Sequence, residues 1–365
     1  MQTIADRVRQ LIAASGMTQG AFAEHVGIET TKLSKSLNGT RKFSSLDLAL
    51  LAESRGVTVD WLLTGAETHV AMAARASGGS SAERAVKTAL EYTTMRSDLA
   101  DLGYEQRWNL PEGVRLRGKW IDQGNALAEE ASAAIRAAGR SVRSDLASVI
   151  EDVFGVDVAV RELGDGFDGM AVATHSSRLI LVSASTIAAR QRFTMAHELG
   201  HLLASDDQQI HKDRDIYSQE SKRGESEVRA NVFAAAVLMP ETELREWLSG
   251  RQLDLNMFCQ LATEFAVSPS ALSYRLENLR IIDVGTRERL RVLSGKEAAR
   301  RVGRSEVFAQ AAADAMTLKA PRSLVRDTFA AFEDGRATLR PYAQLLGVDP
   351  KMLRAKFAEV DEGQA

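Results

Sequence analysis

Between residues 192 and 203 the chain reads Arg192-Phe-Thr-Met-Ala-His197-Glu198-Leu-Gly-His201-Leu-Leu. Two histidines four residues apart project from the same face of a helix, one turn from each other, and supply two nitrogen ligands for a tetrahedral zinc ion. Glu198 stands beside them, close enough to act on a water that the metal activates without being a ligand itself. The opposite face of the same helix carries an apolar stripe of Phe193, Ala196, Leu199 and Leu203, so the sequence predicts one core face and one chemical face.

A third ligand is expected on a second helix, and residues 225–239 offer one before Pro240 ends the helix. Glu227 and Asn231 are again four residues apart and share a face. We expect Glu227 to bind the metal and Asn231 to hydrogen-bond the outer nitrogen of a ligand histidine. The predicted core stripe of this helix consists of Val228, Val232, Ala235 and Met239.

These two motifs resemble those of the ImmA/IrrE metallopeptidases, cytoplasmic zinc proteases that cleave helix-turn-helix repressors, over roughly residues 140–285. The resemblance implies a zinc cofactor held by His197, His201 and Glu227, with Glu198 as the general base. The chain departs from the family where Arg229 replaces a frequent glutamate and Ser205 replaces a frequent histidine, which puts substrate contacts nearby in doubt.

Composition sets broad limits on the kind of protein. The chain has 365 residues, 45% of them hydrophobic, and a single cysteine, Cys259, which excludes an intramolecular disulfide and fits a reducing cytosol with Cys259 in the core. No apolar run approaches the roughly 18 residues of a membrane helix, and the N-terminus lacks signal-peptide features. We therefore expect a cytoplasmic protein. The net charge of -3 gives no overall case for nucleic acid, so any such case must rest on a local motif.

The first 65 residues contain such a motif. Apolar spacing predicts a first helix from Ile4, a second capped by Thr18, a turn at Gly27 and a third helix from Glu29 to Leu37. A helix, a tight turn and a second helix form the helix-turn-helix arrangement, whose second helix enters the DNA major groove. Because Leu33 and Leu37 face the core, the residues left to face DNA are Thr30, Thr31, Lys32 and Lys35.

This segment, including the Val57-Thr-Val-Asp-Trp61-Leu-Leu-Thr-Gly65 tail, resembles the phage-repressor (XRE-type) DNA-binding domain. The resemblance implies that Gln19 contacts a phosphate, that Thr30, Thr31 and Lys35 read bases, and that the chain binds double-stranded DNA as a homodimer. The alternative is a small helical bundle for protein contacts, because this segment carries seven Lys/Arg against six Asp/Glu.

The remaining patterns predict a mainly α protein with a small, antiparallel sheet, that is, an α+β fold. Strands are expected at 156–163, 169–174 and 179–182, with His175 in a surface turn. With a linker at Ser77-Gly-Gly-Ser-Ser, the predicted domains are 1–66 (helix-turn-helix), 67–140 (linker and helices), 141–285 (zincin-like peptidase) and 286–365 (C-terminal helices). Residues 261–276 and 342–357 repeat the helix-turn-helix rhythm, so each is either an additional DNA-binding unit or a short helical hairpin that packs a core, since such hairpins show the same pattern.

A polar loop is expected over 205–224, bordering the cleft. His211 and Tyr217 in this loop are either oxyanion donors or plain loop residues.

Two functions compete. One is a zinc endopeptidase coupled to a DNA-binding domain, which cleaves a transcriptional repressor and so releases stress- or mobile-element-related genes. The other is a DNA-binding regulator whose zinc domain senses a ligand or stress signal without catalysis. Glu198 favours the peptidase, because a purely sensing site does not need a water-activating carboxylate between its histidines.

Overall fold

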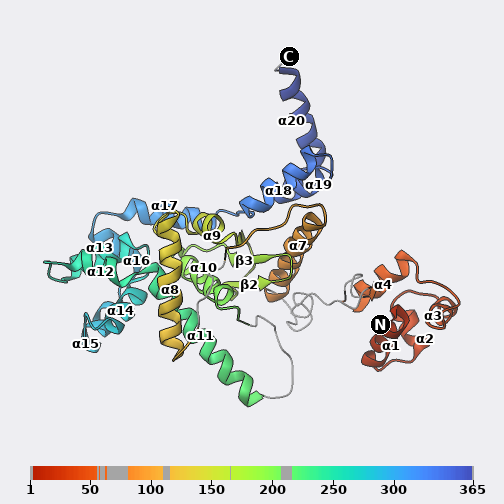
Figure 1. The fold of residues 1–365 in the computed structure, drawn as a ribbon, viewed down its shortest axis with the longest axis horizontal. Coiled ribbons are helices and arrows are strands. Elements are labelled where there is room, and N and C mark those ends of the chain that lie inside the picture. Colours follow the sequence, from red (N-terminus) through yellow and green to blue (C-terminus); the bar gives the residue numbers. More distant parts are fainter. Residues whose placement is uncertain are drawn as a thin grey trace. The chain divides into compact units, whose positions relative to one another are not determined.

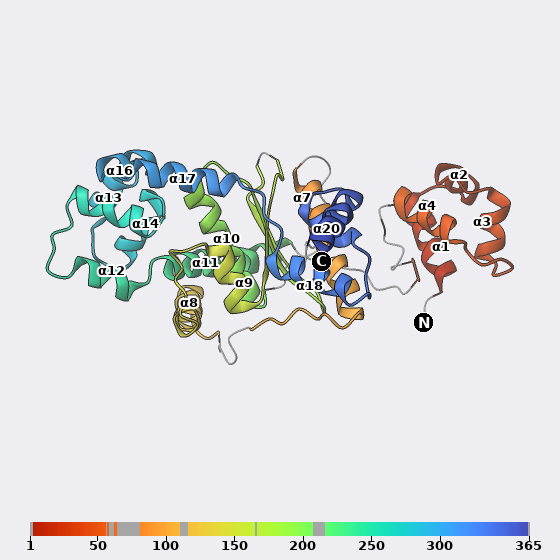
Figure 2. The ribbon, with the colours of Figure 1, turned by 90° about the horizontal axis from the view of Figure 1, so that it is seen from above.

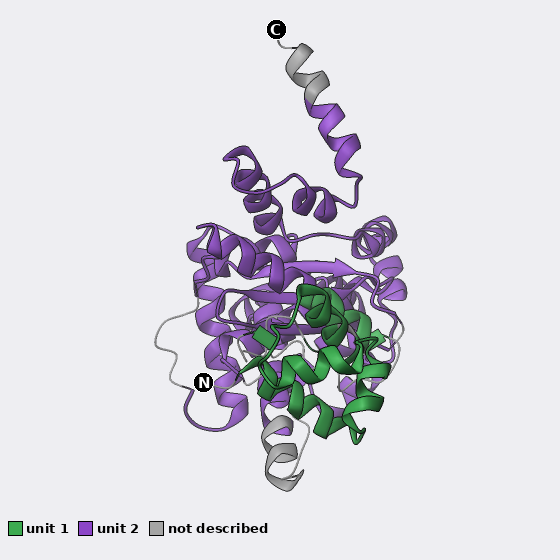
Figure 3. Cartoon of the chain, turned by 90° about the vertical axis from the view of Figure 1, so that its right-hand side faces the viewer, with its two compact units in different colours: residues 1–90, 209–212 green, residues 91–208, 213–365 purple. Residues whose placement is uncertain are grey.

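The computed structural model describes residues 3–55, 57, 62–63, 81–109, 116–164, 166–206 and 216–363. Two compact units emerge from the packing of the chain, the first formed by residues 1–90 and the second by the described residues from 91 onward (Figure 3). Of the linker predicted at 77–81, all but Ser81, the first residue of a helix, lies outside the described residues, and so does most of the tail from Val57 to Gly65.

The first unit contains α1 (Ile4–Ser15), α2 (Gln19–His25), α3 (Thr30–Leu37) and α4 (Ser45–Arg55) (Figure 1). The Thr18 hydroxyl caps α2 by accepting a hydrogen bond from the backbone N–H of Ala21. Gly27 makes the turn between α2 and α3 with a φ of 73°, a conformation that favours glycine. Phe22 and Leu33 are fully buried in the core of this unit.

Helix α7 (Ser81–Asp101) leads from the first unit into the second, which is mainly helical with a small sheet, as predicted. Its further helices are α8 (Trp120–Ala137), α9 (Leu146–Phe154), α10 (Ala188–Leu203), α11 (Ile216–Leu238), α12 (Glu241–Leu248), α13 (Leu255–Glu264), α14 (Pro269–Asn278), α15 (Val284–Leu290), α16 (Gly295–Arg301), α17 (Ser305–Met316), α18 (Arg322–Glu333), α19 (Arg340–Leu346) and α20 (Pro350–Gly363). Within the described residues, no helix combines the length and apolar character needed to span a lipid bilayer.

The sheet has three strands, β1 (Asp157–Arg161), β2 (Gly169–Ala173) and β3 (Arg178–Ser183), in the order β1-β3-β2. β2 and β3 form the expected antiparallel hairpin, in which Ala171 lies opposite Ile180. β1, however, runs parallel to β3, with Val158 opposite the same Ile180, so the prediction of an antiparallel sheet is wrong for β1. The short turn between β2 and β3 makes them neighbours, and the largely buried β3 then has only its other edge free for β1.

Helix α10 packs against β2 and β3 and also against α11, which in turn packs against α8 (Figure 2). Glycines allow these helices to approach closely. A Cβ added at Gly200 of α10 would lie 2.8 Å from the ring of Phe233 on α11, and one at Gly124 of α8 would lie 2.7 Å from the carbonyl oxygen of Arg229. The spacing of α8, α10 and α11 is therefore set by backbone contact as much as by side chains.

Two expectations about α11 are wrong. The helix begins at Ile216, so the polar loop predicted through Gly224 is already helical from residue 216. The predicted core stripe is also rotated, because Val228 is 44% exposed whereas Ala230 and Phe233 are buried. The buried face of α11 is the one that meets both α8 and α10, and sequence periodicity alone does not specify two partners.

The C-terminal helices are joined to the sheet by buried charge. The guanidinium of Arg96 on α7 donates to Asp157 on β1 and to Asp327 on α18, each at 2.6 Å from its nearest oxygen. Lys319 adds an antiparallel backbone bridge to Val160, the outer side of β1. An arginine buried with two carboxylates is costly to separate from either, so α7, β1 and α18 are held together.

Candidate metal centre

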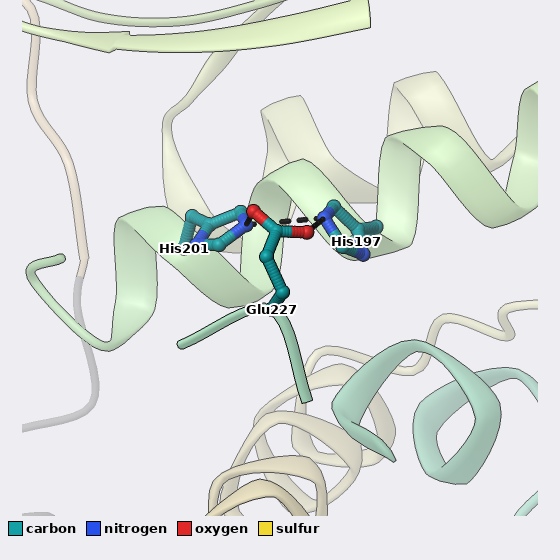
Figure 4. Close-up of side chains that lie close together, drawn as sticks. All are labelled: His197, His201 and Glu227. Atoms are coloured by element: carbon teal, nitrogen blue, oxygen red, sulfur yellow. Dashed lines mark hydrogen bonds and ion pairs between the residues drawn. The ribbon is translucent and has the colours of Figure 1, made fainter. Parts of the chain in front are cut away.

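Three side chains converge where α10 meets α11 (Figure 4). The Nε2 atoms of His197 and His201 lie 3.1 Å apart. One carboxylate oxygen of Glu227 lies 3.2 Å from His197 Nε2 and the other lies 3.4 Å from His201 Nε2. In the described part of the chain, this is the cluster of histidine and acidic side chains whose ligand atoms come close enough to share a metal ion.

The distances fit a small tetrahedral ion. Ligands bound to zinc at about 2.0–2.1 Å in tetrahedral geometry are separated from one another by about 3.3–3.4 Å. The nitrogen-to-nitrogen and nitrogen-to-oxygen separations of 3.1, 3.2 and 3.4 Å lie close to that value. His201 is buried and His197 is mostly buried, whereas the Glu227 side chain is 56% exposed, so the cluster opens to solvent on the glutamate side.

Hydrogen bonds at the outer ring nitrogens determine which way the imidazole lone pairs point. His197 Nδ1 lies 3.1 Å from Asn231 Oδ1, and His201 Nδ1 lies 2.8 Å from Asp206 Oδ2. A carboxylate oxygen and an amide oxygen accept, so both Nδ1 atoms carry the proton and both Nε2 atoms present lone pairs inward. Two lone pairs and a carboxylate facing one point repel one another unless a cation lies between them.

Asp206 belongs to a group of hydrogen-bonded side chains behind His201 that the sequence analysis did not predict. Arg229 donates to the Asp206 carboxylate and also, at 2.9 Å, to Gln123 Oε1, while its guanidinium lies 4.8 Å from the ring centroid of Trp120. Hydrogen bonds of this kind fix the orientation of a ligand imidazole and raise its basicity. The one signal in the sequence was that Arg229 departs from the family pattern, which marked the position without indicating its contacts.

Ser205 explains how Asp206 reaches back to the end of α10. Its φ of 54° lies in the left-handed region, where it turns the chain sharply after the helix. The backbone N–H of Asp206 then donates to the carbonyl of His201 at 3.1 Å. The residue that occupies the family's frequent histidine position therefore acts here through its backbone.

The two glutamates of the site differ in electrostatic environment. When no metal is present and the imidazoles carry a second proton at Nε2, hydrogen bonds from His197, and then from His201, hold the pKa of Glu227 well below its usual range, in spite of the opposing effect of burial; a bound cation would take the place of those two protons. Burial raises the pKa of Glu198, although the two histidines and a hydrogen bond from the backbone N–H of Ala171 oppose that shift. One carboxylate is thus ionised as a ligand requires, and the other has an increased affinity for a proton.

The other predicted site residues lie away from the metal centre or outside the described residues. His211 falls outside the described residues, as does the side chain of Tyr217, and His175 is exposed in the β2–β3 turn. In the first unit, Gln19 and the predicted DNA-facing residues of α3 are exposed: Thr30, Thr31, Lys32 and Lys35. Glu29 accepts a hydrogen bond from Thr31 and pairs with Lys32 at 3.2 Å, which offsets part of the positive charge of α3.

Comparison with known proteins agrees with the geometry. Residues 151–277 match the family model of the IrrE N-terminal-like domain (Peptidase M78). The chain is 36% identical over 133 residues to the radiation response metalloprotease IrrE of Deinococcus radiodurans, which covers 36% of this chain and 40% of that protein. It is 31% identical over 133 residues to the protein of the same name from Deinococcus deserti, of which it covers 46%. The similarity to the two relatives thus spans less than half of either protein, and the family-model match at residues 151–277 contains all three residues of the metal centre.

We predict that Asp206→Ala raises the zinc dissociation constant by about 10- to 100-fold, because His201 loses the acceptor that orients its ring. Titration of the purified chain against a chromogenic chelator measures the constant. Asp206→Asn, which keeps an acceptor oxygen but removes the charge, should show a smaller loss. A wild-type constant in Asp206→Ala would show that Asp206 does not orient the histidine.

We also predict that Glu198→Gln stabilises the metal-free protein at neutral pH. The folded-state pKa of Glu198 lies above its value of about 4.5 in the unfolded chain, so its contribution to stability is present below that pH and is lost as pH rises through the folded pKa. Thermal unfolding in the presence of a chelator should give a higher melting temperature for the mutant than for the wild type. This difference in melting temperature should vanish at low pH and increase as the pH is raised. Glu130→Gln, on the exposed side of α8, serves as the control, and a pH-independent difference would contradict the assignment.

Proposed function

We propose that the chain, whose residues 151–277 belong to the IrrE N-terminal-like family of metallopeptidases, is a zinc-dependent endopeptidase coupled to a DNA-binding unit. The observation that carries the proposal is the convergence of His197, His201 and Glu227, with both imidazole lone pairs directed at one point. The nitrogen and oxygen donors fit zinc, which prefers tetrahedral sites of this composition.

A zinc ion held by these three side chains would act as a Lewis acid toward a peptide carbonyl and lower the pKa of a bound water. Glu198 supplies the proton transfers. Its carboxylate takes a proton from the attacking water and later returns it to the leaving amine. The raised pKa of Glu198 suits this exchange, since a carboxylate of higher proton affinity is a stronger base.

The edge of β2 offers a binding place for an extended peptide. The bonds from Ser183 N–H to Asp168 and from Thr174 N–H to Ser177 mark the residues that pair with β3, so alternation leaves Gly169, Ala171 and Ala173 with outward-facing backbone groups. Among the described strands, β2 has β3 as its partner on one side and none on the other. A substrate strand added there would lie beside Glu198, whose carboxylate already accepts from Ala171.

For the substrate we propose a helix-turn-helix transcriptional repressor, cleaved so that a stress-related or mobile-element operon is released. Two similar proteins carry the name radiation response metalloprotease, which supports a link to stress. In this chain the first unit, which carries the predicted DNA-contacting residues, accompanies the peptidase. Cleavage of a repressor bound at the same operator, cleavage of one elsewhere and self-processing are all compatible with this arrangement.

The competing function is a DNA-binding regulator whose metal domain senses a signal. The same convergence of ligands would serve it. What favours the peptidase is Glu198, which stands between the ligand histidines and next to the edge of β2 that pairs with no other described strand, because a sensing site uses neither feature.

We predict that Glu198→Gln binds zinc with wild-type stoichiometry but cleaves substrate about 10²- to 10⁴-fold more slowly, the usual contribution of a general base. The substrate is found by quantitative comparison of new protein N-termini in cells that carry wild type or Glu198→Gln, under DNA damage and other stresses. A terminus present only with wild type is then reproduced with purified proteins. If identical termini form with both chains while the regulatory output is also unchanged, the sensing function replaces the peptidase.

We predict that Thr31→Ala combined with Lys35→Ala weakens binding to a DNA duplex selected by the wild-type chain from a random library by at least about tenfold, since each lost base contact costs about 1–3 kcal/mol. Fluorescence anisotropy with the selected and a scrambled duplex separates specific from non-specific binding. Arg136→Ala, exposed on α8, is the control. If the double variant binds the selected duplex with the same affinity as the wild-type chain, the alternative holds, namely that the first unit is a helical bundle used for protein contacts.

A further inference from the structure

The hairpin of α19 and α20 has the same turn as the predicted DNA-binding hairpin of α2 and α3. In α19–α20 the backbone N–H of Val348 donates to the carbonyl of Ala343 at 3.0 Å, across Gly347 with a φ of 68°. In α2–α3 the N–H of Ile28 donates to Ala23 at 2.9 Å, across Gly27 with a φ of 73°. The correspondence continues into the second helix, where Leu33 and Leu353 occupy matching positions five residues beyond Ile28 and Val348.

A third hairpin, α13–α14, shares this turn but uses its second helix differently. Val267 donates to Ala262 at 3.0 Å across Ala266, whose φ is 50°. Its second helix is mostly buried, and the Arg275 side chain, only 7% exposed, donates to the carbonyl of Met239. A helix packed in this way cannot enter a DNA groove, so the helix-turn-helix rhythm of residues 261–276 serves the core.

Helix α20 is instead exposed along one side. Phe357 packs against Phe329 of α18, with ring centroids 5.9 Å apart, which fixes the inner face of α20. Outside that contact, Lys351, Arg354 and Lys356 are all exposed, with Lys351 and Arg354 one turn apart on the same side of α20. In Figure 1, α20 extends from α19 toward the C-terminus. The equivalent of the recognition helix is therefore open to a partner.

The charge of this hairpin is unevenly distributed, and its first part favours a polyanion. From Arg340 to Phe357 there are four basic residues and one acidic residue, Asp349, while the three acidic residues that balance them over the whole of α20, Glu359, Asp361 and Glu362, all follow Phe357. From Gln19 to Leu37 two lysines are balanced by two glutamates. None of the four basic side chains of α19–α20 forms an ion pair with a described side chain. Local positive charge that is not paired with a described carboxylate can replace the counterions of DNA phosphates.

We propose that α19–α20 is a second helix-turn-helix element that binds double-stranded DNA, with the N-terminal half of α20 in the major groove. A recognition helix contacts base edges through its N-terminal residues. Lys351 and Arg354 lie in that half, while the acidic residues Glu359, Asp361 and Glu362 follow it in the sequence, toward the far end of the helix. A chain with elements in both units would hold two DNA segments, or two parts of one site.

An apolar patch on the same hairpin identifies the competing partner. Leu346 and Val348 are 43% and 42% exposed, whereas their counterparts in the first unit, Val26 and Ile28, are 3% and 5% exposed. Met352, one helical turn after Val348 in the sequence, is 63% exposed. Such a patch suits a second protein surface, and the exposed basic side chains around it favour DNA instead. Measurement of DNA affinity and of oligomeric state separates the two.

The test uses the full-length chain and a 30-base-pair duplex of random sequence, titrated by fluorescence anisotropy at several salt concentrations. The triple variant Lys351→Ala, Arg354→Ala and Lys356→Ala should reduce the slope of log K against log salt by about 2–3, because each lost phosphate contact removes about 0.9. Affinity at low salt should fall at least about tenfold. Lys351→Arg with Lys356→Arg, which keeps the charge, should retain both affinity and slope.

The control removes the same charge from exposed positions elsewhere in the second unit, with Arg136→Ala, Lys296→Ala and Arg300→Ala, and should match wild type. Circular dichroism of each variant confirms that it is folded. An unchanged slope and affinity in the α20 triple variant overturn the proposal. If Leu346→Ser with Val348→Ser also converts a dimer to a monomer, the hairpin is a protein-docking surface.

Discussion

The second unit depends on how two imidazoles and a carboxylate are held against their own repulsion. The Nδ1 atoms of His197 and His201 are engaged by Asn231 and Asp206, so neither ring is free to turn its lone pair away from Glu227. In water such an arrangement would relax, because nothing would keep three acceptors facing one another. It persists here because the surrounding hydrogen bonds are separately anchored. A site preorganised in this way has already met most of the cost of ordering its ligands before a cation arrives.

Helix packing supplies the anchor. Gly200 allows α10 to approach the Phe233 ring of α11, and Gly124 allows α8 to approach the α11 backbone near Arg229. The same three helices contribute the ligands and the groups behind them, since Gln123 and Trp120 of α8 hold Arg229, which in turn holds Asp206. A shift of α11 by even a fraction of an ångström would therefore be felt both at Glu227 and at the far side of His201. Close-packed interiors transmit such shifts instead of absorbing them.

The sheet relates the metal centre to a place where a peptide can bind. β2 is the strand beside α10, and Gly169 is needed there because an added Cβ would lie 2.6 Å from the Thr194 side chain of that helix. This contact brings the outward edge of β2 to Glu198. The backbone N–H of Ala171, at the edge proposed to hold substrate, donates a hydrogen bond to the Glu198 carboxylate, which is proposed as the base. The parallel strand β1 lies on the other side of β3, where its outer edge is bridged by Lys319 and its Asp157 is paired with Arg96. One edge of the sheet is thus tied to the C-terminal helices, while the other faces the metal centre.

The sequence by itself determined the features that depend on helical periodicity. His197 and His201, and likewise Glu227 and Asn231, share a helix face because four residues make about one turn, and no tertiary contact is needed to know it. The mainly helical fold with a small sheet and the turn at Gly27 follow in the same way from local pattern.

Only the tertiary structure decided which residues each helix or strand face contacts. It brought Asp206 and Arg229 together behind His201, buried Ala230 in place of Val228, and made β1 parallel to β3. It also separated two hairpins of similar sequence rhythm, since α14 is buried in the core and α20 is exposed. The periodicity of a sequence gives the direction in which a side chain leaves its own helix or strand. The residues that this side chain contacts come from distant parts of the chain, and they depend on how all the helices and strands pack together.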